Sequence, residues 1–313
     1  MKVFVTGASG FIGSAVVREL IEAGHQVLGL ARSDAAAAKI ASAGAEVHRG
    51  SLDDLDSLRS AAAASDGVIH LAFIHDFFAD YEAAARTDLH AVQTIGAALE
   101  GTGSPFVITS GTLMLTFFLP QGRLGTEKDV ADAGSVAPRV VSENAALALS
   151  RRGVRSSIVR LSPSVHDKRR GGFTEILVSI AREKGVSGYV GDGANRWPAV
   201  HQLDAARLFR LALEKAPAGS VLHGVAEEGV PTRTIAEVIG RHLDLPVVSI
   251  SPEDAGKHFS HFSWLGLFSS TDNVTSSALT RELLGWQPVH PTLIQDLEDG
   301  HFFEKITAGT VYR

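Results

Sequence analysis

The chain has 313 residues, which is enough for one large α/β domain and a smaller lobe. A content of 45% hydrophobic and 20% charged residues is typical of a globular protein, and the formal net charge of −6 argues against nucleic acid or an anionic membrane as partner. The chain contains no cysteine, which excludes disulfides, thiolate catalysis and cysteine-held metals, and we expect no metal site.

The amino terminus shows no signal-peptide pattern, because Met1 leads directly into an apolar run. No apolar stretch approaches the roughly 18–20 residues that a membrane span needs. We therefore expect a cytoplasmic protein that does not bind membranes.

The first elements of the chain form a recognisable unit. Residues 3–5 are apolar and β-branched or aromatic, which predicts a buried strand, and residues 11–21 are apolar at helical period. Between them, Gly7 permits a tight turn, Gly10 lets the backbone approach a pyrophosphate, and Gly13 lets the helix lie close to the strand. The helix N-terminus offers free N–H groups to the anion, so the unit predicts a bound dinucleotide.

Residues 6–13, TGASGFIG, resemble the T-G-x-x-G-x-x-G motif of the extended and atypical short-chain dehydrogenases/reductases, the group that includes NAD-dependent epimerases and dehydratases. The resemblance extends, with gaps, to an L-G-W-x-P turn at residues 284–288. In this stretch it implies cofactor contacts from six residues: Gly7, Ser9, Gly10, Phe11, Ile12 and Gly13.

The resemblance also implies an α/β fold, a Rossmann-type doubly wound parallel sheet with a smaller C-terminal substrate lobe. The dinucleotide-binding domain is expected at residues 1–165, with returning elements at about 190–228. The substrate-binding lobe is expected at residues 166–190 and 229–313.

The second predicted strand, residues 25–30, ends just before Arg32, Ser33 and Asp34. In such folds an acidic residue here binds the ribose 2′-hydroxyl, whereas a basic one accommodates a 2′-phosphate. Arg32 and Ser33 therefore favour NADP(H) over NAD(H). In the alternative, Arg32 is a solvated surface charge and Asp34 makes the ribose contact.

The third predicted strand, residues 45–48, precedes the expected adenine contact. The resemblance assigns that contact to Ser51, the Leu52 backbone or Asp53. Asp53 is equally well explained as the cap of a helix over residues 54–63.

The fourth predicted strand, residues 67–71, leads to the nicotinamide side of the site. The resemblance implies that the backbone of Leu71, Ala72 and Phe73 lines the cofactor there. The following loop, residues 75–81, carries two candidate substrate contacts, His75 and Phe77.

A helix is expected at residues 87–99, with its apolar residues on one face. In the extended family this helix often contributes to a homodimer interface. Burial against the sheet explains the same pattern without a partner.

The fifth predicted strand, residues 105–109, ends in hydroxyl residues at the edge where ligands bind in open α/β sheets. The resemblance makes Thr109 a cofactor contact, and Ser110 or Thr112 the group that hydrogen-bonds a substrate carbonyl. Gly111 stands where many relatives carry a second hydroxyl, so the choice between these two residues stays open, with simple turn formation as the alternative.

The chain lacks the family's catalytic Tyr-x-x-x-Lys pair. Its three tyrosines are Tyr81, Tyr189 and Tyr312, and none of them is followed by a lysine four residues later. The corresponding helix is expected at residues 138–147. In one frame Arg139 replaces the lysine and Ser135 the tyrosine, with Glu143 as the family's inward-pointing glutamate. In the other, Glu143 occupies the lysine position and Arg139 the tyrosine position. We favour the first frame, because it keeps a cation beside the nicotinamide ribose.

Arg139 then serves both as a cofactor contact and as a catalytic cation. A guanidinium stays protonated and can hold ribose hydroxyls or an oxyanion, but it does not readily donate a proton. Ser135 is a poor acid unaided, so His75 or His166 is a candidate replacement. The pattern is similar to an atypical subgroup with basic residues in place of the tyrosine and lysine.

Beyond the sixth predicted strand, residues 155–161, the chain resembles the turn that brackets the nicotinamide amide. This implies cofactor contacts from Pro163 and Val165 and a substrate contact from His166. Trp197 is a further candidate substrate contact. His201 and Asp204 are expected to be structural, with Asp204 capping a helix over residues 205–214. Residues 258–268 are expected to form either a lid or a core helix.

Together these features predict an NADP(H)-dependent oxidoreductase of atypical short-chain type that reduces a carbonyl of a small, partly apolar substrate. One alternative is a nucleotide-sugar epimerase or dehydratase. Another is a non-catalytic protein that binds NADP(H) and reports redox state, which the missing tyrosine fits equally well.

Overall fold

The computed structural model describes residues 1–74, 81–168, 172–259, 268–299 and 301–303. His75 and Phe77 lie outside the described residues, as does most of the segment 258–268.

The main sheet has seven parallel strands in the order β10-β6-β5-β4-β1-β2-β3. The strand order reverses at β1, which pairs with β2 on one side and β4 on the other, so a topological switch point lies at β1 and β4. The strands are β1 (Lys2–Thr6), β2 (Gln26–Ala31), β3 (Glu46–Arg49), β4 (Gly67–His70), β5 (Pro105–Gly111), β6 (Arg155–Leu161) and β10 (Ser220–Gly224).

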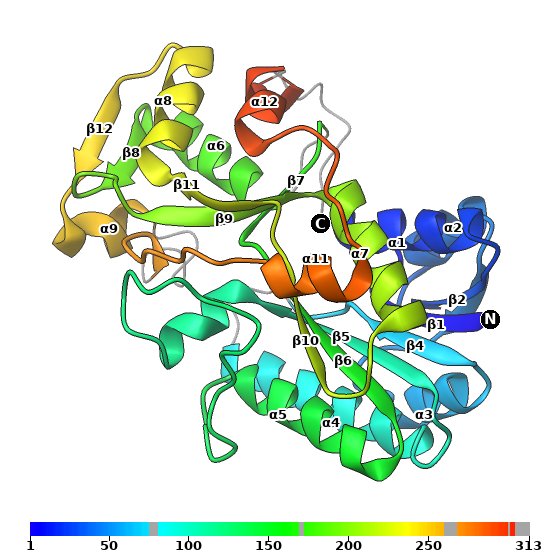
Figure 1. Ribbon diagram of the computed structural model, residues 1–313. Coiled ribbons are helices and arrows are strands. Elements are labelled where there is room, and N and C mark those ends of the chain that lie inside the picture. Colours follow the sequence, from blue (N-terminus) through cyan, green and yellow to red (C-terminus); the bar gives the residue numbers. More distant parts are fainter. Residues whose placement is uncertain (75–80, 169–171, 260–267, 300, 304–313) are drawn as a thin grey trace.

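Helices cover both faces of this sheet (Figure 1). One face packs against α1 (Phe11–Glu22), α2 (Asp34–Ser42) and α7 (Gln202–Lys215). The other packs against α3 (Leu55–Ala63), α4 (Tyr81–Ala98) and α5 (Val140–Leu149). The predicted doubly wound fold is therefore confirmed.

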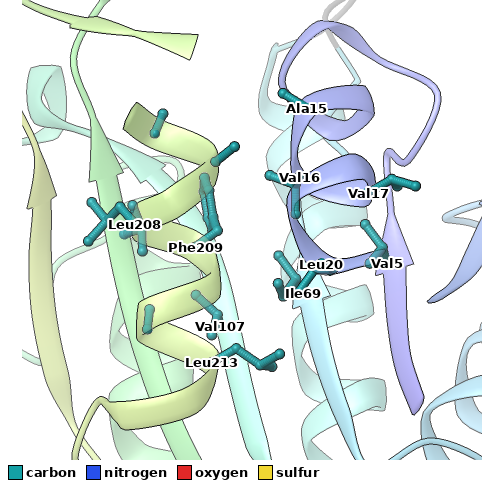
Figure 2. Packing of buried hydrophobic residues seen from close by; sticks show 14 of the residues in the cluster. Val5, Ala15, Val16, Val17, Leu20, Ile69, Val107, Leu208, Phe209 and Leu213 are labelled. Atoms are coloured by element: carbon teal, nitrogen blue, oxygen red, sulfur yellow. The ribbon is translucent and has the colours of Figure 1, made fainter. Parts of the chain in front are cut away.

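Alternation along the strands explains the two-sided core. Val3 and Val5 of β1 belong to the cluster under α1 and α7, whereas Phe4 between them belongs to the cluster under α3, α4 and α5. Figure 2 shows Val5 and Ile69 close to Leu20 of α1, on the same face as α7. A strand buried on both faces needs such a continuous apolar run.

The remaining elements form two small sheets and the helices around them. One sheet has the order β11-β9-β7 and the other pairs β12 with β8. Their strands are β7 (Ser164–His166), β8 (Ser187–Val190), β9 (Arg196–His201), β11 (Glu227–Pro231) and β12 (Val247–Ile250). The helices are α6 (Gly172–Lys184), α8 (Thr232–Leu243), α9 (Pro252–His258), α11 (Ala278–Leu284) and α12 (Leu293–Glu298), and the 3₁₀ turns are η1 (Thr112–Phe117), η2 (Ser150–Arg152) and η3 (His301–Phe303).

The L-G-W-x-P turn fastens the end of the chain to α7. Trp286 is fully buried, and its indole nitrogen donates to the carbonyl of Asp204 at 2.9 Å. The Asp204 carboxylate accepts hydrogen bonds from the backbone N–H groups of Val289 and His290, each at 3.1 Å. The expectation that Asp204 caps α7 is therefore wrong: the cap is His201, whose ring nitrogen accepts from the N–H of Leu203.

The residues that the structure describes include no helix that is long and apolar enough to cross a membrane. Homodimer formation through α4 stays a prediction. Ala91, Val92 and Ile95 on this helix are fully buried within the chain itself, which accounts for the apolar face.

Candidate active site

The glycine turn after β1 is packed too closely for side chains. Gly7 has a φ of 68°, and a Cβ placed on Gly13 would lie 2.0 Å from the carbonyl oxygen of Gly7. Gly10 is the N-cap of α1 and provides no side-chain acceptor for the first turn of the helix. The first N–H groups of α1 are therefore available to an anion.

Two other segments brace this turn. The Phe11 carbonyl accepts a hydrogen bond from the side-chain amide of Gln202 on α7. On the β4 side, the Thr6 hydroxyl lies 2.8 Å from Nδ1 of His70 and accepts from the N–H of Ala72 at 3.1 Å. Thr6 and His70 thus join the ends of β1 and β4, a role that the sequence did not reveal because no spacing rule links them.

The end of β2 has the charge that the NADP(H) prediction requires. Arg32 is exposed, and Ser33 caps α2 by accepting from the N–H of Ala36 at 3.2 Å. Asp34, the alternative ribose contact, lies 2.6 Å from a guanidinium nitrogen of Arg49 at the end of β3. Two arginines therefore flank this corner, and the carboxylate beside them is already paired.

The adenine-side residues lie after β3. Leu52 is buried and Asp53 is exposed. The cap of α3 is Asp54, whose carboxylate accepts from the N–H of Ser57 at 3.0 Å, and not Asp53. The interpretation of Asp53 as a helix cap is wrong, while its contact with adenine stays a prediction.

Arg139 is the centre of the predicted catalytic edge. It donates to the carbonyl oxygen of Thr109 at 2.5 Å, and its guanidinium lies 4.1 Å from the centroid of the Phe73 ring. Its φ of 64° is in the left-handed region, which non-glycine residues rarely adopt. Backbone strain of this kind costs about 1–3 kcal/mol and clusters at functional sites.

Ser110 and Thr112 differ in what they contact. Ser110 Oγ is buried and has no hydrogen-bond partner among the described residues. The Thr112 hydroxyl instead donates to the side-chain oxygen of Asn273 at 2.7 Å, and Asn273 donates back to the Thr112 carbonyl. Ser110 is the hydroxyl left for a ligand, and Thr112 joins β5 to the C-terminal lobe.

Ser135 lies in the loop before α5, where its Oγ accepts a long hydrogen bond of 3.4 Å from the N–H of Ala137. It is half-buried. Its catalytic role stays a prediction.

Glu143 is fully engaged inside the protein. Its carboxylate accepts from the guanidinium of Arg160 at 2.6 Å, and both side chains are almost completely buried. Arg160 also donates to the carbonyl of Asp129. Neighbouring His223 is buried beside Arg160, and burial together with that charge lowers the pKa of His223 to about 4. Glu143 points inward, as the favoured frame requires, and is not free to replace a lysine at the cofactor.

Asp88 on α4 is a second buried carboxylate, close to Arg139. It lies 3.3 Å from Nε2 of His70. Burial opposes its ionisation, but the charge of Arg139 and the hydrogen bonds of His70 and Ser142 outweigh burial and lower the pKa of Asp88. Arg139 is therefore accompanied by a buried anion.

His166 and Trp197, both expected at the substrate, are instead packed in the interior. His166 is 0% exposed, with Nδ1 2.6 Å from the Asp296 carboxylate. Trp197 is 2% exposed, and its indole nitrogen donates to the Thr271 carbonyl at 3.2 Å. Neither side chain reaches the surface in this structure, and a contact of either one with a substrate stays a prediction. Pro163 and Val165 are also buried: Val165 lies in β7 together with His166, and Pro163 directly precedes that strand.

Comparison with known proteins agrees with this geometry. A family model for the NAD dependent epimerase/dehydratase family matches residues 3–133. The uncharacterized protein C2A9.02 of Schizosaccharomyces pombe is 48% identical over 303 residues, which cover 97% of this chain and 100% of that protein. The chain belongs to the NAD-dependent epimerase/dehydratase family.

Other members of the short-chain superfamily are more distant. The 2-alkyl-3-oxoalkanoate reductase of Stenotrophomonas maltophilia is 27% identical over 235 residues, covering 72% of this chain and 69% of the reductase. The solved structure of DesIV, a dTDP-glucose 4,6-dehydratase from Streptomyces venezuelae with NAD and TYD bound, matches with a TM-score of 0.72 at 20% identity, covering 96% of each chain. The resemblance seen in the sequence motifs is therefore confirmed, and this epimerase/dehydratase-family fold is the one expected.

The residues present fit a dinucleotide. A glycine cradle that a single Cβ would fill lies at the switch point, and the unpartnered Ser110 hydroxyl lies beyond it at the end of β5. Among the described residues, no group of histidine, aspartate and glutamate side chains is arranged to hold a metal ion.

Proposed function

We propose that this family member is an NADP(H)-dependent oxidoreductase that reduces a carbonyl on a small, partly apolar substrate. The observation that carries the proposal is the strained Arg139, whose guanidinium donates to the carbonyl of Thr109, the residue before Ser110 with its unpartnered hydroxyl. Reduction of a carbonyl places negative charge on its oxygen, and a cation and a hydroxyl fixed at one point stabilise that charge. The Stenotrophomonas protein is named as the reductase of a 3-oxoalkanoate, which is also a carbonyl compound.

The alternation of β5 supports the pairing of these two groups. Phe106 and Ile108 pack on the face covered by α4 and α5, and Ser110 follows at the same two-residue period. Arg139 directly precedes α5. Hydroxyl and guanidinium therefore belong to the same face of the sheet, at its carboxyl end.

In this mechanism, a reduced nicotinamide supplies the hydride when it is bound. The Ser110 hydroxyl donates a hydrogen bond to the substrate carbonyl and orients it. The positive charge of the Arg139 guanidinium stabilises the charge that develops on oxygen. Phe73, whose ring lies under Arg139, contributes an apolar wall.

Replacing Arg139 with asparagine tests the proposal. Asparagine removes the cation but tolerates a positive φ better than other side chains. We expect kcat/KM for carbonyl reduction to fall about 10²- to 10³-fold, the usual cost of one lost oxyanion-stabilising donor. Binding of NADPH should change by less than about threefold, because a single contact near the ribose carries little of the total.

The measurement is NADPH consumption over a panel of ketones, 3-oxo acids, aldehydes and nucleotide sugars, together with calorimetric titration of NADPH. Arg151→Ala is the matched control, because Arg151 is exposed in η2, just before β6 begins and therefore at the opposite edge of the sheet. Turnover of a nucleotide sugar without net NADPH consumption would favour the epimerase or dehydratase alternative. Tight NADPH binding without any turnover would favour the sensing protein.

The preference for NADPH over NADH rests on Arg32, with Arg49 beside it. Replacing Arg32 with alanine should weaken NADPH binding about 10- to 100-fold, the loss expected for one charge-assisted contact with the 2′-phosphate. NADH binding should stay within about threefold, since NADH lacks that phosphate. Calorimetry with both coenzymes decides this, again with Arg151→Ala as the control. Equal or tighter binding of NADH by the unmodified protein would refute the preference.

A further inference from the structure

The mechanism above still needs a proton. Reduction of a carbonyl to an alcohol adds a hydride to carbon and a proton to oxygen, and neither Ser110 nor Arg139 is a good acid at neutral pH. The tyrosine that supplies this proton in the family is missing from its motif position. The described residues nevertheless bring a tyrosine from another element to this edge of the sheet.

Tyr81 is the first residue of α4. Its ring centroid lies 6.0 Å from that of Phe73, and the Arg139 guanidinium lies 4.1 Å from the same Phe73 ring. Tyr81 is 40% exposed, so its side chain reaches solvent. Phe73 thus connects a tyrosine and an arginine that are 58 residues apart along the chain.

We propose that Tyr81 is the proton donor of this site, paired in space with Arg139 as a replacement for the family's tyrosine and lysine. This inference rests on the proposed function. The carbonyl carbon accepts the hydride that a reduced nicotinamide supplies, and the π electrons move to the oxygen. The oxygen then takes the proton from the Tyr81 hydroxyl, which gives the alcohol and a phenolate. The phenolate is reprotonated by water, which the exposed side of Tyr81 admits.

The charges around Tyr81 suit a donor. Burial raises the pKa of Tyr81, the positive charge of Arg139 lowers it, and the negative charge of Asp88 raises it, with a raised pKa as the result. Tyr81 therefore stays protonated at neutral pH, and Arg139 stabilises the phenolate that forms after transfer. His70, on β4, lies beside Asp88, with its Nε2 3.3 Å from the carboxylate.

The other described tyrosine does not offer the same arrangement. Tyr189 lies on β8 in the C-terminal lobe, with the guanidinium of Arg233 5.5 Å from its ring. The cation beside Tyr189 is therefore Arg233, which does not lie at the end of β5. This tyrosine provides a matched control.

The test replaces Tyr81 with phenylalanine, which keeps the ring packing against Phe73 and removes only the hydroxyl. We expect kcat for the best carbonyl substrate to fall about 10²- to 10⁴-fold, the usual contribution of a general acid. The KM and the Kd for NADPH should stay within about threefold, because the hydroxyl acts on the transition state. Tyr189→Phe should leave kcat unchanged.

A second readout needs neither cofactor nor turnover. The ultraviolet absorbance of tyrosinate is titrated in the unmodified protein and in Tyr81→Phe, and the difference reports Tyr81 alone. Arg139→Asn should raise the pKa of Tyr81 further, because it removes the charge that lowers it. A Tyr81 titration that this substitution leaves unmoved would overturn the pairing.

The outcomes separate the two proposals. A working enzyme whose Tyr81→Phe variant keeps kcat within about threefold overturns the role of Tyr81 and leaves the proposed function standing. An unmodified protein that reduces no carbonyl in the panel overturns the proposed function, and the proton-donor role with it.

Discussion

Replacing Gly13 with alanine should abolish dinucleotide binding, with the affinity for NADPH falling at least about 100-fold. An added Cβ would lie 2.0 Å from the Gly7 carbonyl oxygen, 2.8 Å from the Gly7 carbonyl carbon and 3.0 Å from the Ala8 Cα. All three are backbone atoms of the turn that we expect to hold the pyrophosphate, so α1 must move away from β1. Overpacking of this kind also costs about 1–3 kcal/mol of stability.

Calorimetric titration with NADPH and thermal unfolding of the same preparations measure both effects. Gly256→Ala is the matched control: Gly256 lies on the exposed side of α9, and a Cβ there meets no described atom within 4 Å. It should leave binding unchanged and stabilise the protein by about 0.5–1 kcal/mol, since glycine is unfavourable inside a helix. A Gly13→Ala protein that binds NADPH as well as the control would show that the cofactor does not use this turn.

The fold could be predicted from the spacing of apolar residues and glycines, because that spacing depends directly on which side chains are buried. The apolar run of β1 and the glycines after it predicted strand, turn and helix in the observed order. Boundaries were less secure: α4 begins at Tyr81, although apolar spacing predicted a start at residue 87. Residues 81–86 include three alanines, which favour helix but are too small to give a clear apolar period, so the spacing did not mark them as part of the helix.

Site residues were predictable where one segment determines the contact, and not where two distant segments do. Arg139 directly precedes α5, and its guanidinium lies at the end of β5, where it donates to the Thr109 carbonyl; its catalytic role stays a prediction. Thr112 and His166 have hydrogen-bond partners 161 and 130 residues further along, Asn273 for the Thr112 hydroxyl and Asp296 for Nδ1 of His166. The spacing of residues within one segment does not reveal such pairs. For the same reason the sequence did not predict that Tyr81 lies near Arg139.

Breaking the buried ion pair below the catalytic edge should have the largest effect on stability. Replacing Glu143 with alanine leaves Arg160, which is 0% exposed, without its carboxylate. The expected loss is about 3–5 kcal/mol in the free energy of unfolding, because an uncompensated charge stays buried. Chemical denaturation at neutral pH measures it. Glu100→Ala breaks a comparable pair with Arg152 in which both side chains are about half exposed, and should change stability little.

A double replacement, Glu143→Leu with Arg160→Met, separates two explanations of that loss. If the pair itself stabilises the fold, removing both partners should cost as much as removing one. If the cost is mainly that of a buried charge without a partner, the double variant should be more stable than Glu143→Ala, because two apolar side chains of similar size leave no buried charge unpaired. We expect the second result, because desolvation of Arg160 is nearly complete and Asp129 offers it only a carbonyl oxygen besides Glu143. A double variant as unstable as the single one would mean that attraction within the pair exceeds the cost of burying it.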